Sequence, residues 1–119
     1  MEDWMKEAMA RARTAAAAAE EKKAANIVLL DMRELSSISD IFMICGAANE
    51  RQIKAVADEI AERLDPAVSR RIRRDGEFGS RWVVMDLGGV LVHIFLEEER
   101  ERLELEKLWG DAPRIPAKA

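Results

Sequence analysis

The feature that most constrains the fold is an apolar stretch at residues 82–95, WVVMDLGGVLVHIF, which two glycines interrupt. β-Branched and aromatic side chains dominate both halves, and these residue types favour β-strands. Gly88 and Gly89 accept the positive φ angles that a two-residue hairpin turn requires. The stretch therefore predicts two antiparallel strands joined by a tight turn.

The second of these strands is apolar on both of its faces. Alternation places Val90, Val92 and Ile94 on one side and Leu91, His93 and Phe95 on the other. Such strands typically lie inside a sheet that is covered on both faces.

Helical and strand patterns follow one another along the rest of the 119-residue chain. Asn49 is a good helix N-cap, and Gln52 stands at the capping-box position three residues later. The other expected elements are helices over residues 3–24 and 96–109 and strands over 26–32, 40–45 and 68–74. We expect one α/β domain over residues 1–113, built as a mixed five-stranded sheet with helices on both faces, and a disordered tail over 114–119.

The helix that begins after Asn49 and the helix over residues 3–24 each carry an apolar stripe that fits packing against the core. In the middle helix the stripe consists of Ile53, Val56, Ala57, Ile60 and Leu64, and in the first helix of Trp4, Met5, Ala8, Met9 and Ala12. For the first helix, a mobile arm over residues 1–9 is the alternative.

Composition excludes several classes of protein. The net charge of −4 argues against global binding to nucleic acid, and the apolar runs are too short to span a membrane. Glu2 and Asp3 open a chain start without a leader-like apolar core, and the single Cys45 cannot form an internal disulfide. We therefore expect a cytoplasmic protein without membrane contact.

One local excess of positive charge remains, and it consists of Arg70, Arg71, Arg73, Arg74 and Arg81. On a strand these side chains alternate between faces, so a solvated sheet edge is the simpler interpretation. Contact with RNA phosphates is the alternative.

Residues with catalytic chemistry are scarce, since the chain has one His, one Cys and no Tyr. His93 fits a buried, hydrogen-bonded histidine, with an interface contact as the alternative, and no second His or Cys stands at metal-ligand spacing. Asp86 fits either a carboxylate that caps the glycine turn or a surface-recognition residue. A nucleotide-transfer site would need a second carboxylate where Leu87 stands. We expect no catalytic residue, metal or cofactor.

Two long segments resemble the Iojap-like ribosomal silencing factors. They are DMRELSSISDIFMICGAANERQIKAVADEI and WVVMDLGGVLVHIF with the following EERERLELEKLWGDAP, and the similarity runs over residues 22–114. The resemblance implies a protein that binds the large ribosomal subunit through the universal ribosomal protein fourteen, at the face that meets the small subunit. It implies that subunit joining is blocked and translation repressed when nutrients are scarce. It also implies a nucleotidyltransferase-like fold without enzymatic activity, and in several members a homodimer.

The resemblance also assigns partner-binding residues to this chain. They are Asp40, Phe42, Arg51, Trp82, Asp86, His93 and Phe95. The chain departs from the family pattern at Ile41, at Gly46-Ala47-Ala48, at Leu87 and at Arg102-Leu103, where aromatic or hydroxyl residues are common.

Three functions are candidates for this chain. They are a non-catalytic module that docks on the large subunit, a nucleotidyltransferase-like enzyme suggested by fold analogy alone, and a dimeric adaptor that pairs through its N-terminal helix. A minor contact with ribosomal RNA is compatible with the first.

Overall fold

A mixed sheet of six strands forms the centre of the protein in the computed structural model. The structure describes residues 3–35, 39–69, 73–75, 81–102, 104, 107, 110 and 112–117, with backbone alone at 3–5, 69 and 73–75. The elements are α1 Asp3–Glu21, β1 Ala25–Asp31, β2 Ile41–Ala47, α2 Glu50–Arg63, α3 Pro66–Ser69, β3 Arg73–Asp75, β4 Trp82–Asp86, β5 Val90–Leu96, α4 Glu97–Arg102 and β6 Arg114–Ile115.

The strand order is β3-β4-β5-β2-β1-β6. β2 and β5 run parallel at the centre, from Ile41 opposite Val90 to Ala47 opposite Leu96, and the other neighbours are antiparallel. All of β2 is buried, and β5 is buried except for half-buried Leu91. The prediction of an interior, doubly covered strand is therefore confirmed for β5.

The predicted hairpin is also confirmed. β4 and β5 pair from Trp82 opposite Phe95 to Asp86 opposite Leu91, and the Leu87 N–H donates to the Val90 carbonyl at 2.9 Å. Gly88 and Gly89 have φ angles of 81° and 80°, where a β-carbon would be strained. Both loop positions therefore favour glycine because both have positive φ angles, as the sequence predicts.

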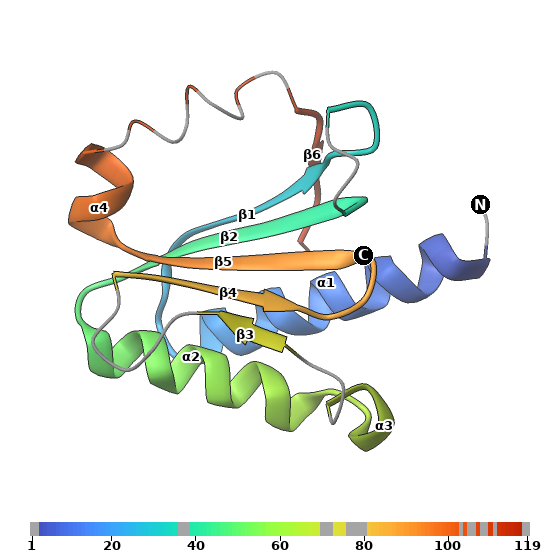
Figure 1. Cartoon of the computed structure of the whole chain (residues 1–119), viewed down its shortest axis with the longest axis horizontal. Helices are drawn as coiled ribbons and strands as arrows, with labels where there is room; N and C mark the ends of the chain where they lie inside the picture. The colour runs from blue at the N-terminus through green and yellow to red at the C-terminus, as the bar shows by residue number, and fades with distance from the viewer. Residues whose placement is uncertain are drawn as a thin grey trace.

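The main core lies between the sheet and the two long helices, which share one face of it (Figure 1). α2 contributes the predicted stripe, every member of which is buried. α1 contributes almost only alanine, namely Ala8, Ala12, Ala15, Ala16, Ala18 and Ala19, with Met9 packed at the margin. Such small side chains let the helix lie close to the sheet. The side chains of Trp4 and Met5, and the arm proposed over residues 1–9, fall partly outside the described residues.

α2 begins as predicted and is also tied to α1. The Asn49 Oδ1 accepts from the Gln52 N–H at 2.8 Å, while Gln52 Oε1 accepts from the Ala48 N–H at 2.7 Å. The Gln52 amide nitrogen then donates to the carbonyls of Lys22 and Lys23 at 2.9 and 3.0 Å. The Gln52 side chain thus caps the start of α2 and also holds the chain that leaves α1.

The α/β class is confirmed, but its details need correction. The sheet has six strands rather than five, because part of the expected disordered tail forms β6 beside the open edge of β1. Helical cover is uneven, since α1 and α2 share one face and the short α4 stands on the other side, at the end of β5 (Figure 1). Whether the fold is nucleotidyltransferase-like stays a prediction.

Two other element boundaries are also wrong. The strand expected over residues 68–74 begins as helix α3, because Pro66 suits a first helical position and Asp65 Oδ1 accepts from the Ala67 N–H at 2.8 Å. α4 ends at Arg102 rather than near residue 109, since Glu104 has a φ of 51°, which a right-handed helix does not allow. The apolar footing expected at Leu105, Leu108 and Trp109 lies outside the described residues.

Candidate functional site

The sheet face opposite α1 and α2 carries a cluster of four rings. Phe42 of β2, Trp82 of β4, and His93 and Phe95 of β5 lie in contact there. The ring centroids are 4.7 Å apart for Phe42 and His93 and 4.8 Å apart for the stacked Trp82 and Phe95. Strand alternation explains the gathering, because these positions point away from the helices on three neighbouring strands. Four of the seven predicted partner-binding residues therefore come together, and we call them the aromatic cluster.

His93 is buried at 5% exposure and accepts a hydrogen bond at Nδ1 from the Trp82 indole N–H, at 3.2 Å. Because Nδ1 accepts, the neutral ring carries its proton on Nε2. Burial lowers the pKa of His93 from its ordinary 6.5 to about 4. The interpretation as a buried, hydrogen-bonded histidine is confirmed, and this ring is uncharged at neutral pH.

Trp82 differs from the other rings because 44% of it is exposed, while Phe42 and Phe95 are buried. Its inner side is fixed by the stacking on Phe95 and by the bond to His93. A large aromatic surface that is held rigid and left in water is typical of a binding site for another macromolecule. Among the described residues, Leu35 at 54% is the other large hydrophobic side chain that is exposed.

The three remaining predicted residues lie apart from the cluster. Asp86 ends β4, and its carboxylate accepts from the Gly88 N–H at 3.0 Å, which confirms the turn-capping interpretation. Asp40 precedes β2 beside the same turn, because the next residue, Ile41, donates to the Gly89 carbonyl at 3.2 Å. Arg51 is exposed in the first turn of α2, where it lines a hollow of about 580 Å³ with Glu50 and with Glu98 of α4.

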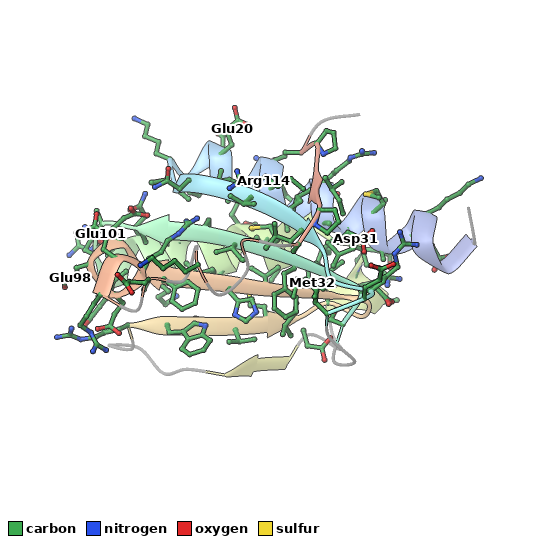
Figure 2. All side chains as sticks on the ribbon, turned by 90° about the horizontal axis from the view of Figure 1, so that it is seen from above. Glu20, Asp31, Met32, Glu98, Glu101 and Arg114 are labelled. Atoms are coloured by element: carbon green, nitrogen blue, oxygen red, sulfur yellow. The ribbon has the colours of Figure 1, made fainter. Side chains whose placement is uncertain are left out.

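Acidic side chains of α4 stand at the Trp82 end of the sheet, which sequence reasoning did not connect with the site. The Leu96 N–H donates to the Arg81 carbonyl at 2.9 Å, so α4 starts beside the first residue of β4. Figure 2 looks onto the sheet face opposite α1 and α2 and shows Glu98 and Glu101 at one end and Asp31 and Met32 at the other. The run of three glutamates after a strand was the available signal, but only the β4–β5 pairing places it near Trp82.

The predicted basic cluster is only partly described. Arg81 pairs with Glu99 at 3.2 Å, and Glu99 also binds Arg102 at 2.9 Å, which lowers the pKa of the Glu99 carboxyl. β3, with Arg73 and Arg74, is an edge strand, so the edge interpretation is confirmed for that part. Arg70 and Arg71 lie outside the described residues.

The site offers binding surface rather than reactive groups. Cys45 is fully buried, and burial raises the pKa of its thiol to about 12, so it is a packing residue at neutral pH. In the part of the chain that the structure describes, no three His, Cys, Asp or Glu side chains gather as a metal site. No described helix is both long and apolar enough to cross a bilayer.

Together, the fold and the site define an α/β domain with a cluster of four rings on one face of its sheet, of which Trp82 is exposed. Comparison with known proteins is more specific. A family model described as "Ribosomal silencing factor during starvation" matches residues 5–119, and the chain belongs to this family of regulators. The chain is 43% identical over 99 residues to "Ribosomal silencing factor RsfS" of Bacillus subtilis, covering 83% of this chain and 84% of that protein.

Two further relatives extend the comparison. A crystal structure of a Chromobacterium violaceum protein superposes with a TM-score of 0.75 at 31% identity and covers 84% of this chain and 83% of that chain. The mouse protein "Mitochondrial assembly of ribosomal large subunit protein 1" is 27% identical over 96 residues, which is 75% of this chain and 40% of the mouse protein. The resemblance to silencing factors inferred from sequence is thus confirmed.

Proposed function

We propose that this protein binds the large ribosomal subunit through the universal ribosomal protein fourteen and blocks subunit joining. The observation that carries the proposal is the half-exposed Trp82, held rigid by His93 and Phe95 on the sheet face opposite α1 and α2. The name of the mouse relative, which refers to the large ribosomal subunit, supports the choice of subunit. Silencing requires only that a folded body occupies the joining face, so no catalysis is needed.

The charge around the cluster fits a basic partner. Exposed Glu98 and Glu101 stand at the Trp82 end, and exposed Asp86 lies at the far end of β4. Arg81, the neighbour of Trp82, and Arg102 both pair with Glu99, so one of their two positive charges is compensated. Ribosomal proteins that lie on RNA are rich in Lys and Arg, and complementary charge steers association and selects the partner. This pattern leaves RNA contact a minor role in the proposal.

The test is a sucrose-gradient profile of mixed subunits with and without the protein. Free subunits should increase at the expense of joined ribosomes, and the protein should sediment with the large subunit. Trp82→Ala should weaken binding by about 30-fold, as expected for a central aromatic anchor worth about 2 kcal/mol. Leu35→Ala is the matched control, because it removes the other exposed apolar side chain and should leave binding unchanged.

A second pair of variants tests the charge argument. Glu98→Lys and Glu101→Lys should reduce the association rate most at low salt, whereas Glu62→Lys, exposed on α2, should not. Equal binding by all variants would contradict the proposed surface, and unchanged subunit joining would contradict the proposed function.

Three further expectations belong to the same proposal: a cytoplasmic location, the absence of enzymatic activity, and a homodimer. We infer a cytoplasmic protein that acts without enzymatic activity. Mg²⁺-dependent incorporation of labelled nucleotide that Asp86→Ala abolishes would contradict this. A homodimer is tested by light scattering on the full chain, where a dimer unchanged by the charge reversal Lys6→Glu, at an exposed position of α1, would exclude that side of α1 from the interface.

A further inference from the structure

The helix α4 has six residues, and every one of its side chains is charged. A short helix normally stays on a sheet by burying an apolar face, and α4 has no apolar side chain to bury. Two of its charged residues are nevertheless buried, Glu99 at 8% exposure and Arg100 at 5%. Within this helix, the side-chain contacts that hold it to the sheet are therefore polar.

The main attachment point of α4 is Asn26, near the start of β1. The Arg100 Nη1 donates to the Asn26 carbonyl at 2.8 Å, and the Asn26 amide nitrogen donates to Glu97 Oε2 at 3.3 Å. The end of the Glu97 side chain also occupies the space where a β-carbon at Gly46 would stand. One residue of β1 thus binds α4 through both its backbone and its side chain.

The backbone of β1 is irregular at this same residue. Asn26 has a φ of 51°, in the left-handed region that asparagine tolerates better than most residues. From Ala25 to Val28, three steps along β1 match two steps along β2, which is a β-bulge. Bulges redirect groups of a strand and are common next to functional sites. Regular pairing with β2 is therefore given up at the residue that binds α4.

The exposed acidic residues of α4 lie on a neighbouring side of the helix. Glu98 and Glu101 are three positions apart, so they are neighbours on the helix surface. Figure 2 shows both at one end of the sheet, and the bond from the Leu96 N–H to the Arg81 carbonyl places the start of α4 beside the start of β4. The contacts at Asn26 thus determine where these two carboxylates stand relative to Trp82.

We propose that Asn26, Glu97 and Arg100 are positioning residues, which hold α4 so that Glu98 and Glu101 meet basic side chains of the ribosomal partner. The inference rests on the proposed function and names the residues that set its charge complementarity. Two carboxylates on a fixed helix lose less freedom on binding than two on a loose segment, and they present the charge pattern that selects a basic partner.

Arg100→Met tests the inference because its effect on charge and its effect on position have opposite signs. The substitution keeps an apolar stem and removes the donor to the Asn26 carbonyl. Loss of a positive charge alone should speed association with a basic partner, whereas a loosened α4 should slow it. We expect association with purified large subunits at low salt to slow by about fivefold.

Two matched variants accompany this measurement. Arg100→Lys keeps the charge and a donor, so it should retain most of the association rate. Arg102→Met removes the same charge from an exposed position of the same helix and should not slow association. Equal slowing by Arg100→Met and Arg102→Met would overturn the inference.

A change without charge gives a second test if circular dichroism shows that Arg100→Met does not fold. Asn26→Gly accepts the φ of 51°, keeps the backbone carbonyl and removes only the amide donor to Glu97. Association should slow by about twofold. An unchanged rate in this variant would overturn the role of Asn26.

A chain that also carries Glu98→Gln and Glu101→Gln separates positioning from a general loss of structure. The positioning residues act through these two carboxylates, so Arg100→Met or Asn26→Gly should have no further effect on association in this background. Slowing by the same factor as in the parent chain would overturn the inference.

Amide exchange on the free protein gives a readout without the ribosome. The N–H groups of Glu101 and Arg102 should exchange about tenfold faster in Arg100→Met, while those of β2 keep their rates. Unchanged exchange in α4 overturns the positioning role and leaves the docking role intact. Absence of binding by the unmodified protein overturns the docking role, and the inference with it.

Discussion

The single histidine makes the stability of this protein depend on pH in a way that can be calculated from one side chain. His93 has an ordinary pKa of 6.5 when unfolded and a pKa lowered to about 4 by burial in the native state. Between these values the unfolded chain binds a proton that the folded chain does not, so the free energy of unfolding falls as pH falls. At about 1.4 kcal/mol per pH unit, the loss is about 2 kcal/mol by pH 5 and about 3 kcal/mol by pH 4.

Urea unfolding at pH 8, 7, 6 and 5 measures this dependence. His93→Gln removes the titrating group and should flatten the curve above pH 5, although the variant is less stable overall. Asp31, Glu59 and Glu99 do not interfere, because arginine partners lower their pKa and their contribution is lost only below the ordinary 3.8 or 4.5. An unmodified protein whose unfolding free energy is constant from pH 8 to pH 5 would refute the assignment of a buried, neutral His93.

Three further substitutions test how the elements are joined. Gln52→Ala should destabilise the protein by about 2 kcal/mol in urea unfolding, more than the ~1 kcal/mol expected for Asn49→Ala, because Gln52 also binds the chain leaving α1. Equal effects would show that the contact with α1 contributes nothing. Gly46→Ala brings a β-carbon against the end of the Glu97 side chain, which must move away, so the melting temperature should drop, and Glu97→Ala in the same chain should restore most of the loss. Gly88→Ala should cost about 1 kcal/mol through its φ of 81°, and a loss no larger than that of an exposed helix substitution would argue against the positive-φ turn.

Local patterns predicted the parts of the fold in which neighbours in sequence decide the outcome. The β4–β5 hairpin depends on Gly88 and Gly89, and the start of α2 depends on Asn49 and Gln52, all within a few residues of the elements they shape. His93 could be predicted as buried because the residues on both sides of it in the strand are apolar. These features could be predicted because the residues that determine them are close together in the sequence.

Other features depend on segments that are far apart in sequence. β6 forms because β1 has an open edge, so a sequence that resembles a polar tail becomes a strand. The bond between Trp82 and His93 requires the register of β4 on β5, and the acidic residues of α4 reach Trp82 through the same register. Arg51 of α2 and Glu98 of α4 line one hollow although they are 47 positions apart, which residue spacing alone does not determine.

The contacts of α1 have a consequence for the order in which the protein folds during synthesis. Arg11 donates to the Gly88 carbonyl and Arg13 to that of Pro116, which are 77 and 103 positions further along the chain. The helix leaves the ribosome among the first segments, yet these acceptors are translated near the end. Its alanine face packs mainly on β1, β2 and α2, which are complete by residue 63, so that face can be covered before the acceptors of the two arginines are made. Pulse-labelled nascent chains stalled before residue 88 lack both acceptors and β5, and α1 should be more sensitive to protease in them than in chains released after residue 117.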